Sequence, residues 1–155
     1  MSPAPFAILP ADWTAHREQL RAIRRIVFIE EQGVPEALEW DELDEHCRHV
    51  LALATDGRAI GTGRLTPDGR IGRMAVLREW RDRGVGSAIL QYLLRQARKA
   101  GHATAQLHAQ THALSFYARH GFTATGPEFL EANIPHRVMC INLAVQSGGP
   151  QAPGR

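Results

Sequence analysis

The stretch Ile71–Ala100 constrains the fold most, because a strand pattern, a glycine-rich turn and a long helical pattern follow one another directly. Ile71–Val76 has the length and apolar content of a strand. Along Gly84–Ala100 apolar residues recur at helical spacing, and Gly101 is suited to end that helix. The first N–H groups of a helix have no partner within it, and the helix dipole adds partial positive charge there. We therefore expect an anion to bind at Arg81–Ser87.

Other phosphate-binding patterns fit this turn less well. A P-loop requires Gly-Lys-Ser/Thr, but Gly86 is followed by Ser87 and Ala88. A dinucleotide fingerprint would need a small residue where Ile89 stands and an acidic residue near Thr104–Gln106. The two glycines alone would fit a plain chain reversal at a helix start equally well, so the rest of the chain has to decide.

The remaining pattern predicts one mixed sheet with helices on its faces, an α/β class (α+β mixed sheet). Asp-Gly pairs at 56–57 and 68–69 indicate an antiparallel meander. The expected strands are Phe6–Leu9, Val50–Ala54, Ala59–Leu65, Ile71–Val76, Thr104–Ala109, Phe122–Thr125 and Val138–Leu143. The expected helices are Trp13–Phe28 with Asp12 as N-cap, Gly84–Ala100 and Thr111–His120.

Three segments are expected to lie outside regular structure. The acidic stretch Glu36–His46 is predicted to be a loop with a short helical turn, either simply solvated or forming a rim that attracts a cationic amine. A long loop through Pro127 and Pro135 is expected to join the last two strands. We expect a single domain over residues 1–145 and a disordered tail over 146–155, which is rich in Gly and Pro.

Composition excludes several function classes. The net charge of +2, from 18 basic and 16 acidic residues, gives no nucleic-acid footprint. No apolar run approaches the roughly 20 residues of a membrane span, and the N-terminus lacks a signal-peptide pattern, so we expect a cytoplasmic protein without membrane or nucleic-acid partners. Cys47 and Cys140 form no Cys-x-x-Cys pair, and we expect no metal site.

Two blocks together resemble a known family. Arg81-x-x-Gly84-x-Gly86 matches the Gln/Arg-x-x-Gly-x-Gly/Ala signature of the GNAT superfamily of N-acetyltransferases, and Ala113–Phe122 is similar to that family's segment ending in Phe-Tyr-x-x-x-Gly-Phe. The resemblance covers roughly Ala7–Leu143. Finer features that resemble the ElaA/YjcF-like branch are Val27–Gln32, Leu107–Gln110 and Ile134–His136.

The resemblance implies a GNAT fold that binds acetyl-CoA as cosubstrate, without a metal. The pantetheine arm would lie in a gap beside the strand that precedes the glycine turn. The implied cofactor-binding residues are Met74, Ala75, Val76, Arg81, Asp82, Arg83, Gly84, Val85, Gly86, Ser87, Gln110, Ser115 and Phe116. A backbone N–H near Val76 would stabilise the oxyanion of the thioester.

The resemblance also implies the chemistry. Tyr117 matches the family's acid, because a phenol can protonate a leaving thiolate, although spacing alone would fit a core aromatic residue. The general base stays open among Glu31, His108, Glu30 and His136, each of which could instead be structural.

We therefore expect acetyl transfer to a primary amine of a small molecule or peptide, by direct attack in a ternary complex. The alternative is a coenzyme A-binding GNAT sensor without turnover. Because members of the family often pair, a homodimer is also an expectation.

Overall fold

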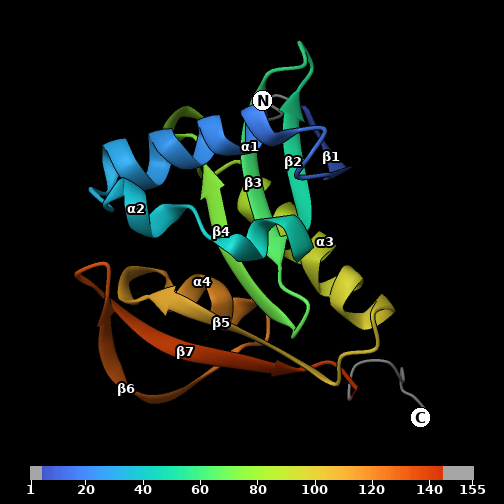
Figure 1. Ribbon diagram of the computed structural model, residues 1–155. Coiled ribbons are helices and arrows are strands. Elements are labelled where there is room, and N and C mark those ends of the chain that lie inside the picture. Colours follow the sequence, from blue (N-terminus) through green and yellow to red (C-terminus); the bar gives the residue numbers. More distant parts are fainter. Residues whose placement is uncertain (1–4, 145–155) are drawn as a thin grey trace.

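The computed structural model describes residues 5–144, and these form one seven-stranded sheet flanked by helices (Figure 1). The strands occur in the order β1-β2-β3-β4-β5-β7-β6 across the sheet. The strands are β1 (Phe6–Ala11), β2 (Arg48–Ala54), β3 (Ala59–Leu65), β4 (Arg70–Val76), β5 (Thr104–Gln110), β6 (Thr123–Glu131) and β7 (Ile134–Asn142). The helices are α1 (Arg17–Arg24), η1 (Arg25–Glu31), α2 (Glu36–Glu39), η2 (Glu42–His46), η3 (Arg78–Trp80), α3 (Val85–Lys99), η4 (Thr111–Ala113) and α4 (Leu114–Arg119).

The sheet opens between β4 and β5. These two strands are the parallel neighbours, and they pair only at Arg70–Gln106 and Ile71–Leu107. All other neighbours are antiparallel, and β5 continues to pair with β7 up to Gln110. Figure 1 shows β4 and β5 diverging beyond this point. From Gly72 onward, the edge of β4 that faces β5 is therefore free for another extended chain.

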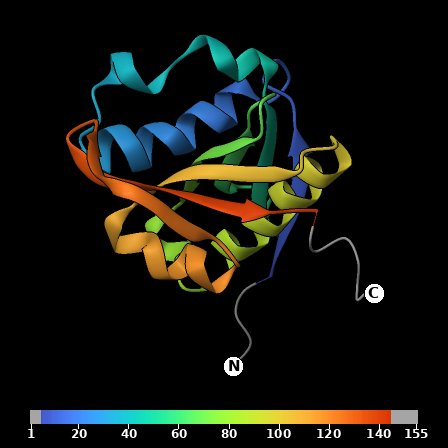
Figure 2. The same cartoon turned by 90° about the horizontal axis from the view of Figure 1, so that it is seen from below.

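The helices form two layers, with α1 and η1 on one face of the sheet and α3 and α4 on the other (Figure 2). The fit of α3 on β3 depends on two glycines of β3. A Cβ at Gly63 would lie 2.9 Å from side-chain atoms of Ile89 and Leu93, and one at Gly61 would lie 3.0 Å from Ile89. The fold class predicted from the sequence is confirmed. Within residues 5–144, no helix is long and apolar enough to cross a membrane.

The first helix begins later and ends differently than predicted. Asp12 does act as a cap, but its carboxylate accepts from the N–H of Ala15 in a turn that precedes α1. The helix continues past Phe28, because its second half, η1, is a π-helix that extends to Glu31. Single-turn π segments often occur at functional sites, and η1 borders the larger cavity described below.

The predicted loop through Pro127 and Pro135 is wrong, because β6 and β7 form a long hairpin. Its turn is Ala132–Asn133, where both residues have positive φ (51° and 65°), as a type I′ turn requires. The register shifts between Thr125 and Phe129, so Pro127 lies where a missing N–H does not break the ladder. The predicted tail, 146–155, lies outside the described residues.

Candidate active site

The glycine turn forms a helix start with free N–H groups. Gly84 precedes α3 in the left-handed region (φ 86°), and the helix's first hydrogen bond runs from Ala88 N–H to the Gly84 carbonyl at 3.0 Å. The N–H groups of residues 85–87 therefore have no partner within the helix. A cavity of about 280 Å³ lies over this helix start, and its lining residues are Val76, Arg81, Asp82, Gly84, Gly86, Ser87, Phe116 and Arg119.

The two arginines predicted for this turn already contact other residues. The Arg81 guanidinium pairs with both carboxylate oxygens of Glu31 at 2.7 Å, and its Nε donates to the Val76 carbonyl at 2.9 Å. Arg83 lies over the ring of Trp80, with the guanidinium carbon 5.2 Å from the centroid. Of the predicted residues, Val85 is buried in the core and Ser115 is exposed outside the cavity lining.

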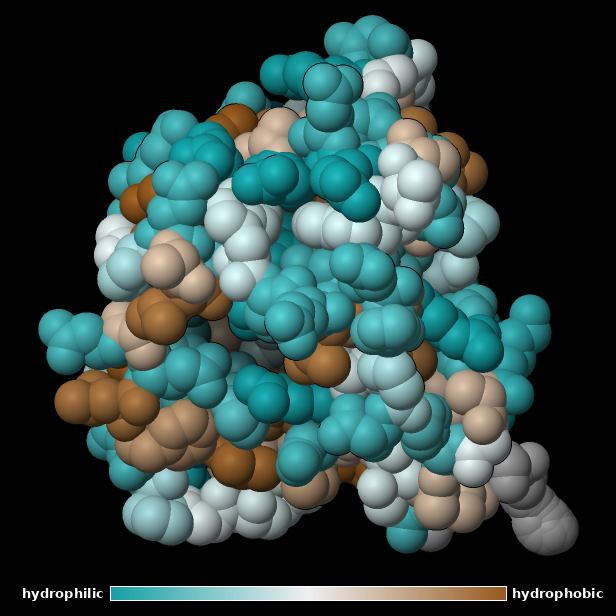
Figure 3. Space-filling view, viewed as in Figure 1, coloured by the Kyte–Doolittle hydropathy of each residue, from teal (hydrophilic) through white to brown (hydrophobic). Residues whose placement is uncertain are grey.

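A second, larger cavity of about 550 Å³ opens on the face that carries α1 and η1. Figure 3 shows this face as largely hydrophilic, with apolar residues scattered between the polar ones. The four strands β4, β5, β6 and β7 supply one side of the cavity, and segment 28–43 supplies the other. The polar residues that line it are Gln32, Glu39, Asp41, Arg64, Arg70, Arg73, His108, Gln110, His112, Tyr117, Glu131 and His136.

Tyr117 reaches this cavity from α4, on the opposite face of the sheet. Its hydroxyl lies 3.9 Å from Met74 Sδ, and its ring packs edge-on against Phe116 and Phe122 at centroid distances of 5.0 and 6.0 Å. Burial raises the pKa of Tyr117 to about 12. The phenol therefore keeps its proton at neutral pH and stands beside the free edge of β4.

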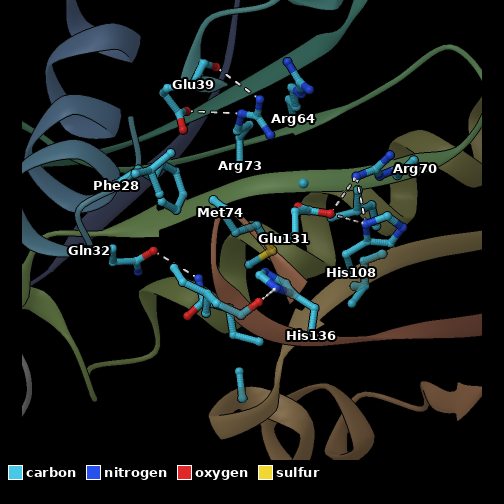
Figure 4. A pocket seen from close by; sticks show the side chains of 18 of the residues that line it. Phe28, Gln32, Glu39, Arg64, Arg70, Arg73, Met74, His108, Glu131 and His136 are labelled. Carbon is cyan, nitrogen blue, oxygen red and sulfur yellow. Dashed lines mark hydrogen bonds and ion pairs between the residues drawn. The ribbon is translucent and has the colours of Figure 1, made fainter. Parts of the chain in front are cut away.

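His108 and Glu131 form a polar pair with Arg70 nearby (Figure 4). His108 Nδ1 lies 2.7 Å from Glu131 Oε1 and 3.0 Å from Arg70 Nη2. Burial disfavours the charged form of Glu131, but its hydrogen bond with His108 and the neighbouring charges outweigh burial and lower its pKa. An ionised Glu131 accepts a hydrogen bond from Nδ1–H, which leaves His108 Nε2 with the lone pair.

His136 is a second imidazole in the same cavity. Its Nδ1 donates to the Ile134 carbonyl at 2.6 Å, so Nε2 carries the lone pair here as well. The ring is buried and stacks on Phe129 at 5.9 Å, and Phe129 also packs edge-on against His108 at 5.1 Å. Sequence reasoning named both histidines but missed Glu131, which fell within the predicted loop.

Comparison with known proteins assigns the family. A family model described as an acetyltransferase (GNAT) domain matches residues 15–143. The chain belongs to the GNAT acetyltransferases. YjcF of Bacillus subtilis (strain 168), described as an uncharacterized N-acetyltransferase, is 37% identical over 132 residues, which cover 80% of this chain and 93% of YjcF.

Solved structures agree with this assignment. The crystal structure of an acyl-CoA N-acyltransferase from Pseudomonas aeruginosa is 28% identical with a TM-score of 0.77, and covers 87% of this chain and 99% of its own. Escherichia coli ElaA is 24% identical with a TM-score of 0.77, covers 88% of this chain and 99% of its own, and shares the fold. The resemblance seen in the sequence is therefore confirmed.

Within this GNAT fold, Glu31 is separated from the other two predicted catalytic residues. Hydrogen bonding from Arg81 is the main cause that lowers the Glu31 pKa, and Arg78 lies 3.4 Å away. Glu31 does not line the larger cavity, whereas Tyr117 and His108 both do. Glu30 is exposed on the same helix.

The acidic stretch of this GNAT chain forms α2 and η2, and four of its six carboxylates pair with arginines, whereas Glu42 and Glu45 are exposed. Three of the arginines are contributed by α1, β3 and β4. The ion pairs are Arg25–Glu36, Arg24–Glu39, Arg73–Glu39, Arg64–Asp41, Arg73–Asp41, Arg24–Asp44 and Arg64–Asp44. This network anchors segment 36–46 as one wall of the larger cavity.

Gln110 lies at the end of β5 in a chain of side-chain hydrogen bonds. Its amide nitrogen donates to Gln32 Oε1 at 3.0 Å, and His112 Nε2 lies 2.7 Å from its Oε1. The bond to Gln32 links the end of η1 to the far half of the divided sheet. Gln110 therefore lines the larger cavity, as do Met74 and Gln32, whereas Ala75 is buried in the core.

Proposed function

We propose that the protein transfers an acetyl group from acetyl-CoA to a primary amine of a small molecule or peptide, by direct attack in a ternary complex. One observation carries the proposal: the free edge of β4 runs from the Tyr117 cavity at Met74 to the helix-start cavity at Val76. An extended thioester arm with a pyrophosphate at one end matches that arrangement of a strand edge and an anion site.

The residues present fit coenzyme A. The N–H groups of residues 85–87, the hydroxyl of Ser87 and the guanidinium of Arg119 would hold the pyrophosphate. The backbone groups of Met74–Val76 that face the free edge of β4, apart from the Val76 carbonyl that accepts from Arg81, would pair with the pantetheine arm, and one of their N–H groups would stabilise the oxyanion. Acetyl-CoA supplies the activated acetyl group when it is bound.

We assign the base to His108. A primary amine is mostly protonated at neutral pH and must lose a proton to become a nucleophile. Nε2 of His108 can take that proton, directly or through a water, while Glu131 holds Nδ1–H and stabilises the imidazolium that forms. The amine nitrogen attacks the thioester carbon and the carbon–sulfur bond breaks; the second proton that the nitrogen then loses passes through solvent water to the released sulfur, which leaves as the thiol.

We assign Tyr117 to the departing sulfur. Its raised pKa means that complete proton transfer to a thiolate with a pKa near 8.5 is uphill, so its main contribution is a hydrogen bond to the developing charge. The same burial raises the pKa of a thiol that forms at this position, which narrows the difference between the two groups.

The test combines binding with turnover. Calorimetric titration with acetyl-CoA measures binding, and free-thiol release with a panel of primary amines measures transfer. We expect Tyr117→Phe to bind acetyl-CoA as the wild type does and to lose about 10²–10³-fold in kcat, the cost of one lost hydrogen bond to the developing charge. Phe122→Leu, a neighbouring change without a hydroxyl, is the packing control. Failure to bind acetyl-CoA would refute the proposal, and binding without thiol release from any amine would favour the sensor.

A further inference from the structure

The three arginines that line the larger cavity differ in how many donors they have left. Arg64 is 5% exposed, and both of its terminal nitrogens are held by Asp41 or Asp44. The Arg70 side chain is 40% exposed, and only its Nη2 lies near protein partners, 4.0 Å from Glu131 Oε1 and 3.0 Å from His108 Nδ1, whose proton is directed to Glu131. The Arg73 side chain is 20% exposed and donates from Nη2, whereas its buried Nε lies 3.2 Å from Glu39 Oε2 without making a hydrogen bond. Among the described residues, Arg70 Nε and Nη1 and Arg73 Nη1 have no partner and are not sealed off from solvent.

The space between these two arginines is open. Both belong to β4, with Gly72 between them, and all three residues line the cavity. A Cβ built on Gly72 would meet no atom within 4 Å. Arg73 has a positive φ of 51°, which is uncommon for a residue other than glycine and accompanies the register shift of β4 against β3. Figure 4 shows Arg73 directed toward Glu39 and Arg70 directed toward His108 and Glu131.

The carboxylates that line the cavity, by contrast, already have partners. Glu39 and Asp41 belong to a network in which Arg24, Arg64 and Arg73 face Glu39, Asp41 and Asp44, so its formal charges cancel. Glu131 accepts a hydrogen bond from His108, and its charge is compensated by Arg70 Nη2 at 4.0 Å. A polycationic acceptor would therefore find no uncompensated carboxylate among the described lining residues, whereas an anionic group would find free guanidinium donors.

We propose that the acceptor is an amino-acid-type substrate, a small primary amine that also carries a carboxylate. Arg70 binds this carboxylate in the space over Gly72, and Arg73 supplies a second positive charge beside it. This inference rests on the proposed acetyl transfer. Arginine suits the role because its planar fork presents paired donors to a carboxylate. This arrangement places the substrate's carboxylate beside His108, the proposed base, in the cavity that Tyr117 also lines.

The experiment compares matched pairs of amines, each pair consisting of an amino acid and the same molecule with its carboxylate converted to a primary amide. The readout is the ratio of the two kcat/KM values from thiol release. We expect wild type to prefer the carboxylate form, and Arg70→Gln to reduce that preference about 10- to 100-fold, the range of a lost charge-assisted hydrogen bond. Disturbance of His108 alone would slow both members of a pair equally and leave the ratio unchanged.

Two further variants guard the interpretation. Arg58→Gln removes the same charge from a surface pair with Glu79 outside the cavity and should leave the ratio unchanged. Gly72→Ala places a methyl group in the open space between Arg70 and Arg73 without removing a charge. It should raise KM for the carboxylate form more than for the amide. A wild-type preference for the amide or for polyamines, or an unchanged ratio in Arg70→Gln, would overturn the inference.

The same pairs separate this inference from the proposed function. If no amine is acetylated, the proposed transfer fails, and calorimetric titration of the CoA-loaded protein with each pair still measures carboxylate binding. Tighter binding of the carboxylate member, lost in Arg70→Gln, would support the anion site, whereas equal binding of both members would overturn it.

Discussion

Replacing Arg24 with Met is expected to destabilise the domain strongly. Arg24 is 1% exposed and donates to Glu39 and Asp44 at 2.8 Å each, and to the Glu39 carbonyl at 2.9 Å. Breaking a buried pair costs about 3–5 kcal/mol, because a charge is left without compensation. Since Arg64 and Arg73 still neutralise part of that charge, we expect about 3 kcal/mol, or a loss of roughly 6–12 °C in Tm for a domain of this size.

Thermal melts of Arg24→Met at pH 7 and pH 5 measure this loss. Burial already raises the pKa of Glu39, and removal of Arg24 should raise it further. A raised carboxyl pKa destabilises the fold above that pKa, and the penalty disappears as pH falls through it. The difference in Tm from wild type should therefore narrow at pH 5.

The neighbouring Arg25 gives the matched control. It pairs with Glu36 at 2.6 Å, but both side chains are exposed, so Arg25→Met should leave Tm unchanged. The double variant Arg24→Met/Glu39→Gln should recover part of the loss, because it restores a neutral network in which Arg64 and Arg73 face Asp41 and Asp44. A Tm within about 3 °C of wild type for Arg24→Met, or an equal loss for Arg25→Met, would refute the reasoning.

Three further predictions concern single positions. Gly63→Ala should lower the free energy of unfolding by about 1–3 kcal/mol in urea titrations, because its Cβ would press on Leu93; stability equal to wild type would contradict this packing. Gly84→Ala should weaken acetyl-CoA binding in calorimetry and cost about 1 kcal/mol of stability, because φ is 86° there; unchanged binding would argue against the turn's role. Burial opposes ionisation of Asp41, but hydrogen bonds from Arg64 lower its pKa to about 2. That stability is present above the unfolded pKa and lost as pH falls through 2, so Asp41→Asn should be less stable than wild type by up to about 2 kcal/mol at pH 7, with the difference shrinking toward pH 2 in urea titrations.

Local backbone chemistry made parts of the fold predictable from sequence. The Asp-Gly turns, the glycine start of α3 and the helical period of α3 each act over a few residues, and their elements appear within one or two positions of the prediction. The β6–β7 hairpin was missed because its turn, Ala132–Asn133, lacks the Asn-Gly or Asp-Gly pair that signals a type I′ turn. Two prolines nearby indicated a loop instead.

The candidate site was less predictable because its groups meet through tertiary structure. Glu131 lies 23 residues from His108 in the chain, and only the pairing of β5, β7 and β6 brings them together. Arg119 stands two positions after Tyr117, so its place on the same short helix was an available signal for the anion site. The acidic stretch was misread because its arginine partners come from α1, β3 and β4, which no local pattern connects to it.

Arg81, Gly84 and Gly86, the three fixed positions of the family signature, have different physical roles, and the structure explains which substitutions each can accept. Gly84 needs its glycine for a left-handed backbone. A Cβ at Gly86 would meet Phe116 only at an ordinary 3.6 Å, which agrees with a signature that accepts Gly or Ala there. Arg81 fills a position where the signature accepts Gln or Arg, so their shared property is N–H donation rather than charge. Donation from Arg81 to the Val76 carbonyl supplies that property, and it fixes the end of β4 against the turn.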